Sequence, residues 1–137
     1  MGQSDPLKLL IVDDEDGIVD YTKKIYSRKG FTTFGATDGI AAVELYLKEH
    51  PAISLIDVHM PFSPIDGIET LRRIKEIDKD AICIMVTRIT ETKSIELARQ
   101  YGANAYILKP LEIGELDKVI SEVAKIDLTN MQKGRTE

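Results

Sequence analysis

The stretch Leu9-Leu10-Ile11-Val12-Asp13-Asp14-Glu15 decides the fold, because a short apolar run ends there abruptly in three acidic residues. Four more apolar runs of strand length follow, and several are rich in isoleucine and valine, which favour strands. The five expected strands cover residues 9–12, 31–36, 53–56, 81–86 and 105–108. Strands of near-continuous apolar character are usually buried on both faces, so these runs predict a parallel sheet covered by helices, with the short third run at its centre.

Apolar residues recur at helical spacing between these runs and predict five amphipathic helices. The expected apolar faces are Ile18, Thr22 and Ile25 with Tyr21 beside them; Ala42, Val43, Tyr46 and Leu47; Ile68, Leu71 and Ile74; Ile95, Ala98 and Tyr101; and Leu116, Val119, Ile120 and Val123. Asp38 is expected to cap the second helix and Thr90 or Thr92 the fourth. Gly30 and Gly102 are expected to end the first and fourth helices. The pattern is therefore a single α/β domain of the (βα)5 kind.

Length and composition limit the classes of protein. The chain has 137 residues, enough for one core, and 43% hydrophobic with 30% charged residues is a globular balance. We expect one domain over residues 1–126, with residues 5–8 as a leader and 127–137 as a polar tail or the start of a linker. A net charge of −5 without a basic stripe argues against direct nucleic-acid binding by this chain. The apolar runs are too short to span a membrane, and the lone Cys83 favours a reducing, cytoplasmic setting.

Polar side chains follow four of the predicted strands. The first strand ends in Asp13 and Asp14, the third in Asp57, the fourth in Thr87 and the fifth in Lys109. In open parallel α/β sheets, ligands bind beyond the carboxyl ends of the strands. One aspartate in such a place is usually a helix cap or a loop residue, but caps alone do not explain five polar residues at four strand ends. We therefore expect a functional site at this edge.

The chemistry of this set follows from its charges. Three neighbouring carboxylates repel one another, and a hard divalent cation such as Mg²⁺ relieves the repulsion while keeping several water ligands. A carboxylate is also a nucleophile that forms an aspartyl phosphate. The amine and the hydroxyl then stabilise negative charge on the phosphoryl oxygens. The set predicts phosphoryl chemistry.

Five sequence blocks carry a resemblance to a known family. They are Leu9-Leu10-Ile11-Val12-Asp13-Asp14-Glu15, Ile56-Asp57-Val58-His59-Met60-Pro61, Asp66-Gly67, Val86-Thr87 and Tyr106-Ile107-Leu108-Lys109-Pro110. In this order they resemble the signature of bacterial response-regulator receiver domains, over residues 7–125. The resemblance implies a flavodoxin-like doubly wound sheet with strand order 2-1-3-4-5.

The resemblance also implies a phosphorylation site and its metal. Asp57 is then the phosphoacceptor, and the donor is a histidine kinase or a phosphotransfer protein. Mg²⁺ is expected to be bound by Asp14 directly, by Asp13 mainly through water, by Asp57 and by the backbone carbonyl of His59. Lys109 is expected to pair with the phosphoryl oxygens.

Switching residues are implied in the same way. Thr87 is expected to turn its hydroxyl toward the phosphoryl group, and Tyr106 to move between outward and inward positions. The fourth helix, fifth strand and fifth helix then form the surface that changes. The Lys109-Pro110 bond is expected to be cis, which is the minority state for X-Pro bonds.

Two features depart from the family pattern. Four residues, Phe62-Ser63-Pro64-Ile65, separate the Met-Pro and Asp-Gly pairs, where two are usual; the longer loop either alters which donors approach Asp57 or is neutral variation. Arg88 replaces the usual alanine or glycine after the switch threonine, and either contacts the phosphoryl group or points into solvent. His59 and Ile89 occupy positions that tune phosphate lifetime in the family.

Other functions stay open. The Asp14-Glu15-Asp16-Gly17 stretch has the appearance of a haloacid-dehalogenase-type phosphatase motif, with Asp14 as nucleophile, but this leaves Asp57 without a role. A degenerate receiver that only binds proteins is a second alternative. A receiver is not an enzyme in the ordinary sense, since it catalyses only its own phosphorylation and dephosphorylation. The target protein or output domain, a phosphorylation-dependent homodimer, and origin in a larger protein are undecided.

Overall fold

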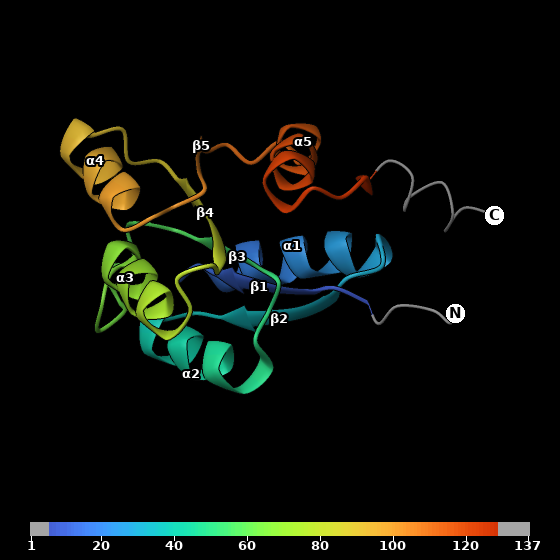
Figure 1. Cartoon of the computed structure of the whole chain (residues 1–137), viewed down its shortest axis with the longest axis horizontal. Helices are drawn as coiled ribbons and strands as arrows, with labels where there is room; N and C mark the ends of the chain where they lie inside the picture. Colours follow the sequence, from blue (N-terminus) through green and yellow to red (C-terminus); the bar gives the residue numbers. More distant parts are fainter. Residues whose placement is uncertain (1–5, 129–137) are drawn as a thin grey trace.

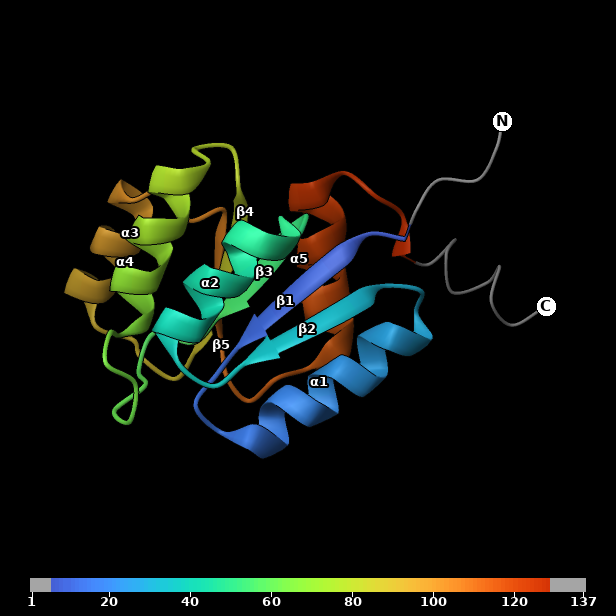
Figure 2. The ribbon, with the colours of Figure 1, turned by 90° about the horizontal axis from the view of Figure 1, so that it is seen from below.

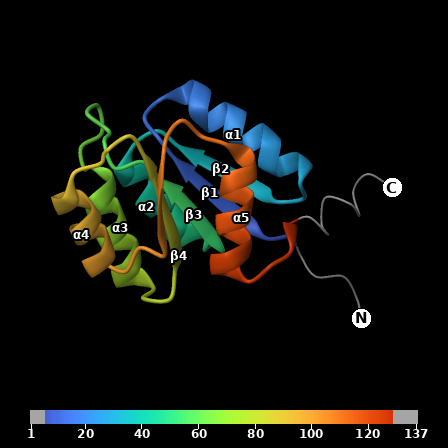
Figure 3. The same cartoon turned by 90° about the horizontal axis from the view of Figure 1, so that it is seen from above.

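The computed structural model describes residues 6–128 and contains a five-stranded parallel sheet in the order β2-β1-β3-β4-β5. The strands are β1 Lys8–Val12, β2 Thr32–Ala36, β3 Ile53–Ile56, β4 Ile82–Thr87 and β5 Ala105–Leu108. The helices are α1 Asp16–Arg28, α2 Gly39–Glu49, α3 Gly67–Ile77, α4 Thr92–Gln100 and α5 Ile113–Ala124. The predicted strand order is thus confirmed, and α1 and α5 cover one face while α2, α3 and α4 cover the other (Figures 1, 2 and 3).

Alternating side chains of the strands build a core on each face of the sheet. In β1, Leu10 and Val12 pack with α2 and α3, whereas Leu9 and Ile11 pack with α1 and α5. This follows from the two-residue period of a strand, which sends successive side chains to opposite faces. All four residues of β3 are buried, which confirms its predicted central place. A strand with no exposed face, in which Ser54 is the one polar residue, therefore suits only the middle of this sheet.

The predicted helix faces are correct in part. Ile68, Leu71 and Ile74 of α3 are all buried, as expected. In α2, however, Leu47 is 54% exposed, so the apolar stripe is narrower than the sequence indicates. In α4 only Ala98 is buried. Exposed apolar residues are common on helices at the rim of a sheet, because there is not enough polar surface to cover the molecule.

The buried face of α1 differs from the prediction. Val19, Thr22 and Tyr26 face the core, whereas Tyr21 is 55% exposed. The Tyr26 hydroxyl donates to Asp117 Oδ1 of α5 at 2.7 Å, and the buried Lys29 ammonium lies 3.1 Å from Asp117 Oδ2. These polar contacts join α1 to α5 and select a face one residue away from the purely apolar one.

The helix ends follow the prediction except at α4. Asp38 caps α2 by accepting a hydrogen bond from the Ala41 N–H at 2.8 Å. Gly30 and Gly102 follow α1 and α4 with positive φ angles of 105° and 92°, as expected. The predicted threonine cap is wrong, because Glu91 holds the N-cap position of α4 and makes no side-chain cap bond, while Thr92 is already helical.

Residues near both ends of the described region take part in the fold. Lys8, which was expected in the leader, belongs to β1 and pairs with Glu49 at 3.2 Å. Leu128 is 1% exposed and packs in the core on the α1 and α5 face, two residues beyond the expected boundary at 126. The remainder of the predicted tail, residues 129–137, lies outside the described residues.

Candidate functional site

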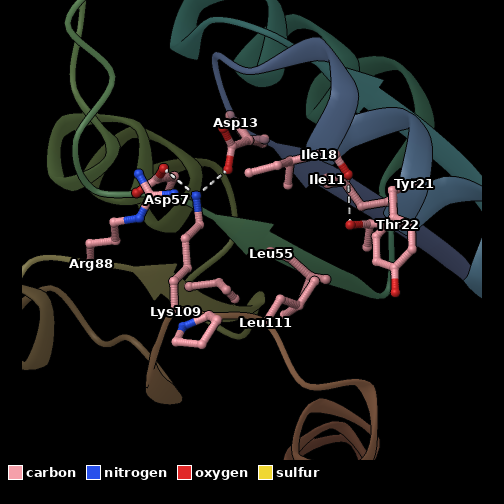
Figure 4. Close-up of a pocket in the computed structure, with 13 residues that line it drawn as sticks. Ile11, Asp13, Ile18, Tyr21, Thr22, Leu55, Asp57, Arg88, Lys109 and Leu111 are labelled. Carbon is pink, nitrogen blue, oxygen red and sulfur yellow. Dashed lines mark hydrogen bonds and ion pairs between the residues drawn. The ribbon is translucent and has the colours of Figure 1, made fainter.

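Lys109 holds two aspartates together at the carboxyl edge of the sheet. Its Nζ donates to Asp13 Oδ2 at 2.7 Å and to Asp57 Oδ2 at 3.0 Å (Figure 4). Asp13 directly follows β1, Asp57 directly follows β3, and Lys109 directly follows β5. Since these strands are parallel, their ends bring together residues that lie up to 96 positions apart in sequence.

Backbone N–H groups orient both carboxylates. The N–H of Glu15 donates to Asp13 Oδ1 at 2.9 Å, and the N–H of His59 donates to Asp57 Oδ1 at 3.2 Å. Each carboxylate therefore has one oxygen on a backbone N–H and the other on the Lys109 ammonium. Charge-assisted hydrogen bonds of this kind fix the direction of a carboxylate, so Asp57 is held ready in one orientation.

The electrostatics of the site leave it short of positive charge. Asp13 and Asp57 are buried, and burial raises the pKa of the Asp13 carboxyl although the hydrogen bond from Lys109 opposes the shift. Burial lowers the pKa of the Lys109 ammonium, but its hydrogen bonds to Asp13 and Asp57 outweigh this and raise it overall. The ammonium thus stays charged and is shared by two carboxylates, an arrangement that favours binding of a further cation.

Thr87 and Tyr106 meet at Ile89. The fully buried Thr87 Oγ accepts the Ile89 N–H at 3.3 Å, and the Tyr106 hydroxyl donates to the Ile89 carbonyl at 2.8 Å. Thr87 is also joined to the lysine, because its carbonyl accepts the Lys109 N–H at 2.8 Å. Any movement of the Thr87 hydroxyl therefore breaks a contact in the segment that Tyr106 holds.

Asp14 lies on a different wall of the site from Asp13. A cavity of about 220 Å³ is lined by Asp14, Asp57 and His59, and Asp13 is not among its lining residues. Within residues 6–128, no three His, Cys, Asp or Glu side chains form a ready-made metal cluster. Asp57 therefore lies beside both other aspartates, because it shares Lys109 with Asp13 and lines this cavity with Asp14. Asp14 and Asp57 both line this cavity, and carboxylate oxygens are the donors that suit Mg²⁺ with retained waters.

The longer loop between β3 and α3 is fixed at one point. Ser63 Oγ accepts the Gly39 N–H at the start of α2 at 2.8 Å and donates to the Ile65 carbonyl at 2.6 Å. Phe62 is 90% exposed and lines the same cavity as Asp57, and its N–H lies 3.5 Å from Asp14 Oδ2. The extra residues therefore line the entrance to the site, and the hydrogen bonds of Ser63 hold them in place.

The close approach of Gly67 to Asp57 is a feature that the sequence did not explain. A Cβ on Gly67 would collide with the backbone carbonyl of Asp57, so α3 begins unusually close to the acceptor strand. The Lys109–Pro110 peptide bond is cis, as the resemblance implied.

Cys83 is fully buried, and burial raises the pKa of its thiol to about 12, which agrees with an inert core role.

Arg88 stands at the border of two cavities. It is exposed, and together with Asp57 and Lys109 it lines both the 220 Å³ cavity and a more apolar one of about 250 Å³ beneath α1. In Figure 4 its side chain extends toward Asp57. No hydrogen bond or ion pair joins Arg88 to any other residue within 6–128.

A doubly wound parallel sheet with an aspartate and a lysine paired at its carboxyl edge defines the receiver class of α/β proteins. The family model of the response regulator receiver domain matches residues 9–121, and the chain belongs to this family. Receiver domains are components of two-component signalling. No helix within the described part of the chain is long and apolar enough to cross a membrane.

Individual relatives agree with the family. The chain is 34% identical to sporulation initiation phosphotransferase F of Bacillus subtilis over 84% of its own length and 91% of that protein. A CheY-like receiver domain from Methanospirillum hungatei has a TM-score of 0.82 and 27% identity, covering 94% of this chain and 98% of that one. CheY in a CheX–CheY–BeF3–Mg complex from Borrelia burgdorferi has a TM-score of 0.80 and 31% identity, covering 86% and 89%.

Proposed function

We propose that this receiver domain accepts a phosphoryl group on Asp57 and acts as a switch in two-component signalling. The observation that carries the proposal is the buried Asp57 carboxylate, which is oriented by the His59 N–H and paired with Lys109 at 3.0 Å. The carboxylate faces a cavity that the donor's phosphoryl group can enter. The competing use of Asp14 as nucleophile has less support, because Lys109 contacts Asp13 and Asp57 instead.

The chemical step is the transfer of a phosphoryl group from the donor to the Asp57 carboxylate. An Asp57 carboxylate oxygen forms a bond to phosphorus while the bond from phosphorus to the donor nitrogen or oxygen breaks, and the donor keeps that electron pair. Lys109 is close enough to Asp57 to hold the negative oxygens of the transferred group. Mg²⁺, bound by Asp14, Asp57 and the His59 carbonyl with Asp13 acting through water, would supply further neutralisation of phosphoryl charge.

The proposed output follows from the contacts of Thr87 and Tyr106. A phosphoryl group on Asp57 offers a new acceptor for the Thr87 hydroxyl, which would then leave its contact with the Ile89 N–H. The segment after β4 would shift, and with it the carbonyl that holds Tyr106. We propose that the surface formed by α4, β5 and α5 changes in this way and is recognised by the target protein.

The partners and setting are proposed on the strength of the family. A histidine kinase or a phosphotransfer protein is the donor, and a downstream protein or output domain reads the switch. The setting is cytoplasmic, and direct contact with nucleic acid by this chain is not expected at a net charge of −5. The only reactions catalysed are phosphorylation and dephosphorylation of the chain itself.

The test is incubation with acetyl phosphate and Mg²⁺, followed by intact mass over time. We expect a gain of one phosphoryl group that is absent in Asp57→Asn and in a sample with EDTA. Asp20→Asn, which removes an exposed carboxylate on α1, is the charge-matched control and should be phosphorylated normally. An adduct that persists in Asp57→Asn would favour Asp14 as nucleophile. A folded protein that gains no adduct and binds no beryllofluoride with Mg²⁺ would favour the binding-only receiver.

A further inference from the structure

The positive charge of Arg88 is not neutralised by any residue in the described part of the chain. Lys109 is shared between two carboxylates at 2.7 and 3.0 Å, whereas no described residue within 6–128 makes an ion pair or hydrogen bond with Arg88. Arg88 directly follows Thr87, the last residue of β4, so its backbone is fixed at the carboxyl edge of the sheet. Among the described residues, the exposed Arg88 side chain is therefore a cation without a partner at the entrance of an acidic site.

Arg88 lies where two cavities meet beside Asp57. Of the residues that the structure describes, only Asp57, Lys109 and Arg88 line both of them. Lys109 is buried between the cavities with 5% of its side chain exposed, while Arg88 stands on the solvent side. A phosphoryl group on Asp57 would thus have an ammonium on its inner side and the guanidinium within reach of its outer side (Figure 4).

We infer that Arg88 binds the phosphoryl group of Asp57 and shields it from water, an inference that rests on the function proposed above. A guanidinium has a planar pair of N–H donors that matches two phosphoryl oxygens. Aspartyl phosphate adds negative charge to a site that already contains Asp13 and Asp14, so the attraction grows on phosphorylation. The contact between Arg88 and the phosphoryl oxygens therefore exists only in the phosphorylated state.

Shielding follows from the direction of hydrolysis. In this reaction the oxygen of water forms a bond to phosphorus, the bond from phosphorus to the Asp57 oxygen breaks, and that oxygen keeps the electron pair. The products are the Asp57 carboxylate, inorganic phosphate and a proton. Because the water approaches opposite the breaking bond, it comes from the open side of the cavity, where Arg88 lies. A guanidinium bound there delays the attack.

The test measures binding and hydrolysis separately. Binding is measured by titrating the Mg²⁺-loaded protein with beryllofluoride, and hydrolysis by following loss of the phosphoryl mass after acetyl phosphate is removed. We expect Arg88→Ala to bind beryllofluoride about fivefold more weakly, equal to about 1 kcal/mol at 1.4 kcal/mol per tenfold. It should also lose its phosphoryl group several times faster. Arg88→Lys, which keeps the charge but not the planar fork, should fall between wild type and Arg88→Ala.

The matched control is Arg28→Ala. Arg28 is an exposed arginine in the last turn of α1, about 18 Å along the helix from the edge where the site lies. The Arg28→Ala substitution removes the same charge and should leave beryllofluoride binding and the rate of hydrolysis unchanged. Equal beryllofluoride affinity in wild type and Arg88→Ala, or equal or slower hydrolysis in Arg88→Ala, would overturn the inference about Arg88. Failure of the wild-type protein to bind beryllofluoride or accept a phosphoryl group would instead refute the proposed function.

Discussion

Lys109 Nζ lies 2.7 Å from Asp13 Oδ2, closer than its 3.0 Å distance to Asp57 Oδ2. The lysine thus pairs most closely with the carboxylate that is proposed to act through water, and it keeps the proposed acceptor within reach. One ammonium shared between two buried carboxylates leaves unbalanced negative charge. A functional site of this kind is maintained at a cost in stability.

The effect of Asp13→Asn on the pH dependence of the free energy of unfolding tests whether the site lowers stability. Because burial raises the pKa of Asp13 in the folded state, folding favours the protonated form, and stability is lost as pH rises through the folded-state pKa. We therefore expect Asp13→Asn to be more stable than wild type at neutral pH. The advantage should shrink toward the unfolded-state pKa of about 3.9. Urea unfolding in EDTA at several pH values measures this, and a less stable variant at neutral pH would show that the Lys109 pairing outweighs the burial.

Gly67→Ala should disturb the phosphorylation site through the backbone. The added methyl group collides with the Asp57 carbonyl, so either α3 or the acceptor strand must move. We expect a loss of about 1–3 kcal/mol in the free energy of unfolding and slower phosphorylation by acetyl phosphate. Gly114→Ala in α5 is the control, because its methyl group meets no atom within 4 Å and should stabilise the helix by about 0.5–1 kcal/mol. A neutral Gly67→Ala would contradict the close approach.

Tyr106→Phe should loosen the segment after β4. It removes the hydrogen bond from the hydroxyl to the Ile89 carbonyl and should cost about 1 kcal/mol in unfolding free energy. Faster amide hydrogen exchange across residues 88–91 should accompany the loss. Tyr101→Phe removes an exposed tyrosine hydroxyl from the end of α4 and serves as the control. Unchanged exchange in Tyr106→Phe would mean that the tyrosine does not hold this segment.

Ser63→Ala should free the longer loop beside the site. The hydroxyl joins the Gly39 N–H to the Ile65 carbonyl, so its removal should cost about 1 kcal/mol and leave one N–H without its partner. Limited proteolysis should then cleave the loop faster than in wild type. Ser94→Ala removes a weaker, exposed contact of 3.5 Å and should have little effect. Equal cleavage rates in Ser63→Ala and wild type would show that the loop is held by other contacts.

The strands and the site edge were predictable because they depend on period and position. The run 53–56 is apolar except for Ser54, suits only a strand covered on both faces, and its carboxyl end then places Asp57 at the ligand edge. The strand order was implied by the resemblance and is confirmed by the structure, and it could not follow from periodicity alone.

The errors arose where a tertiary contact overrides local pattern. Lysine is normally exposed, so no sequence signal indicates that Lys29 is buried against Asp117. That contact, together with the bond from Tyr26, sets the rotation of α1 and leaves Tyr21 exposed. Leu128 lies in a polar stretch, and only its packing in the core shows that it belongs to the domain.

The pairing of Lys109 with two aspartates was likewise beyond the sequence. Strand ends predict that charged groups are neighbours, but the choice of partners depends on side-chain geometry within a few ångströms. Three carboxylates were expected to converge, and Asp57 shares Lys109 with Asp13 and a cavity with Asp14. The unpaired state of Arg88 could be recognised only once its surroundings were known.

The most direct test of the central claim is chemical trapping of the acceptor. The protein is incubated with acetyl phosphate and Mg²⁺, reduced with borohydride, and digested for peptide sequencing by mass spectrometry. Borohydride converts an acyl phosphate into an alcohol, so a phosphorylated aspartate is read as homoserine. We predict homoserine at position 57 alone, and only when acetyl phosphate and Mg²⁺ are both present. Homoserine at position 14, or at no position in a protein that binds beryllofluoride, would contradict the assignment of Asp57 as the phosphoacceptor.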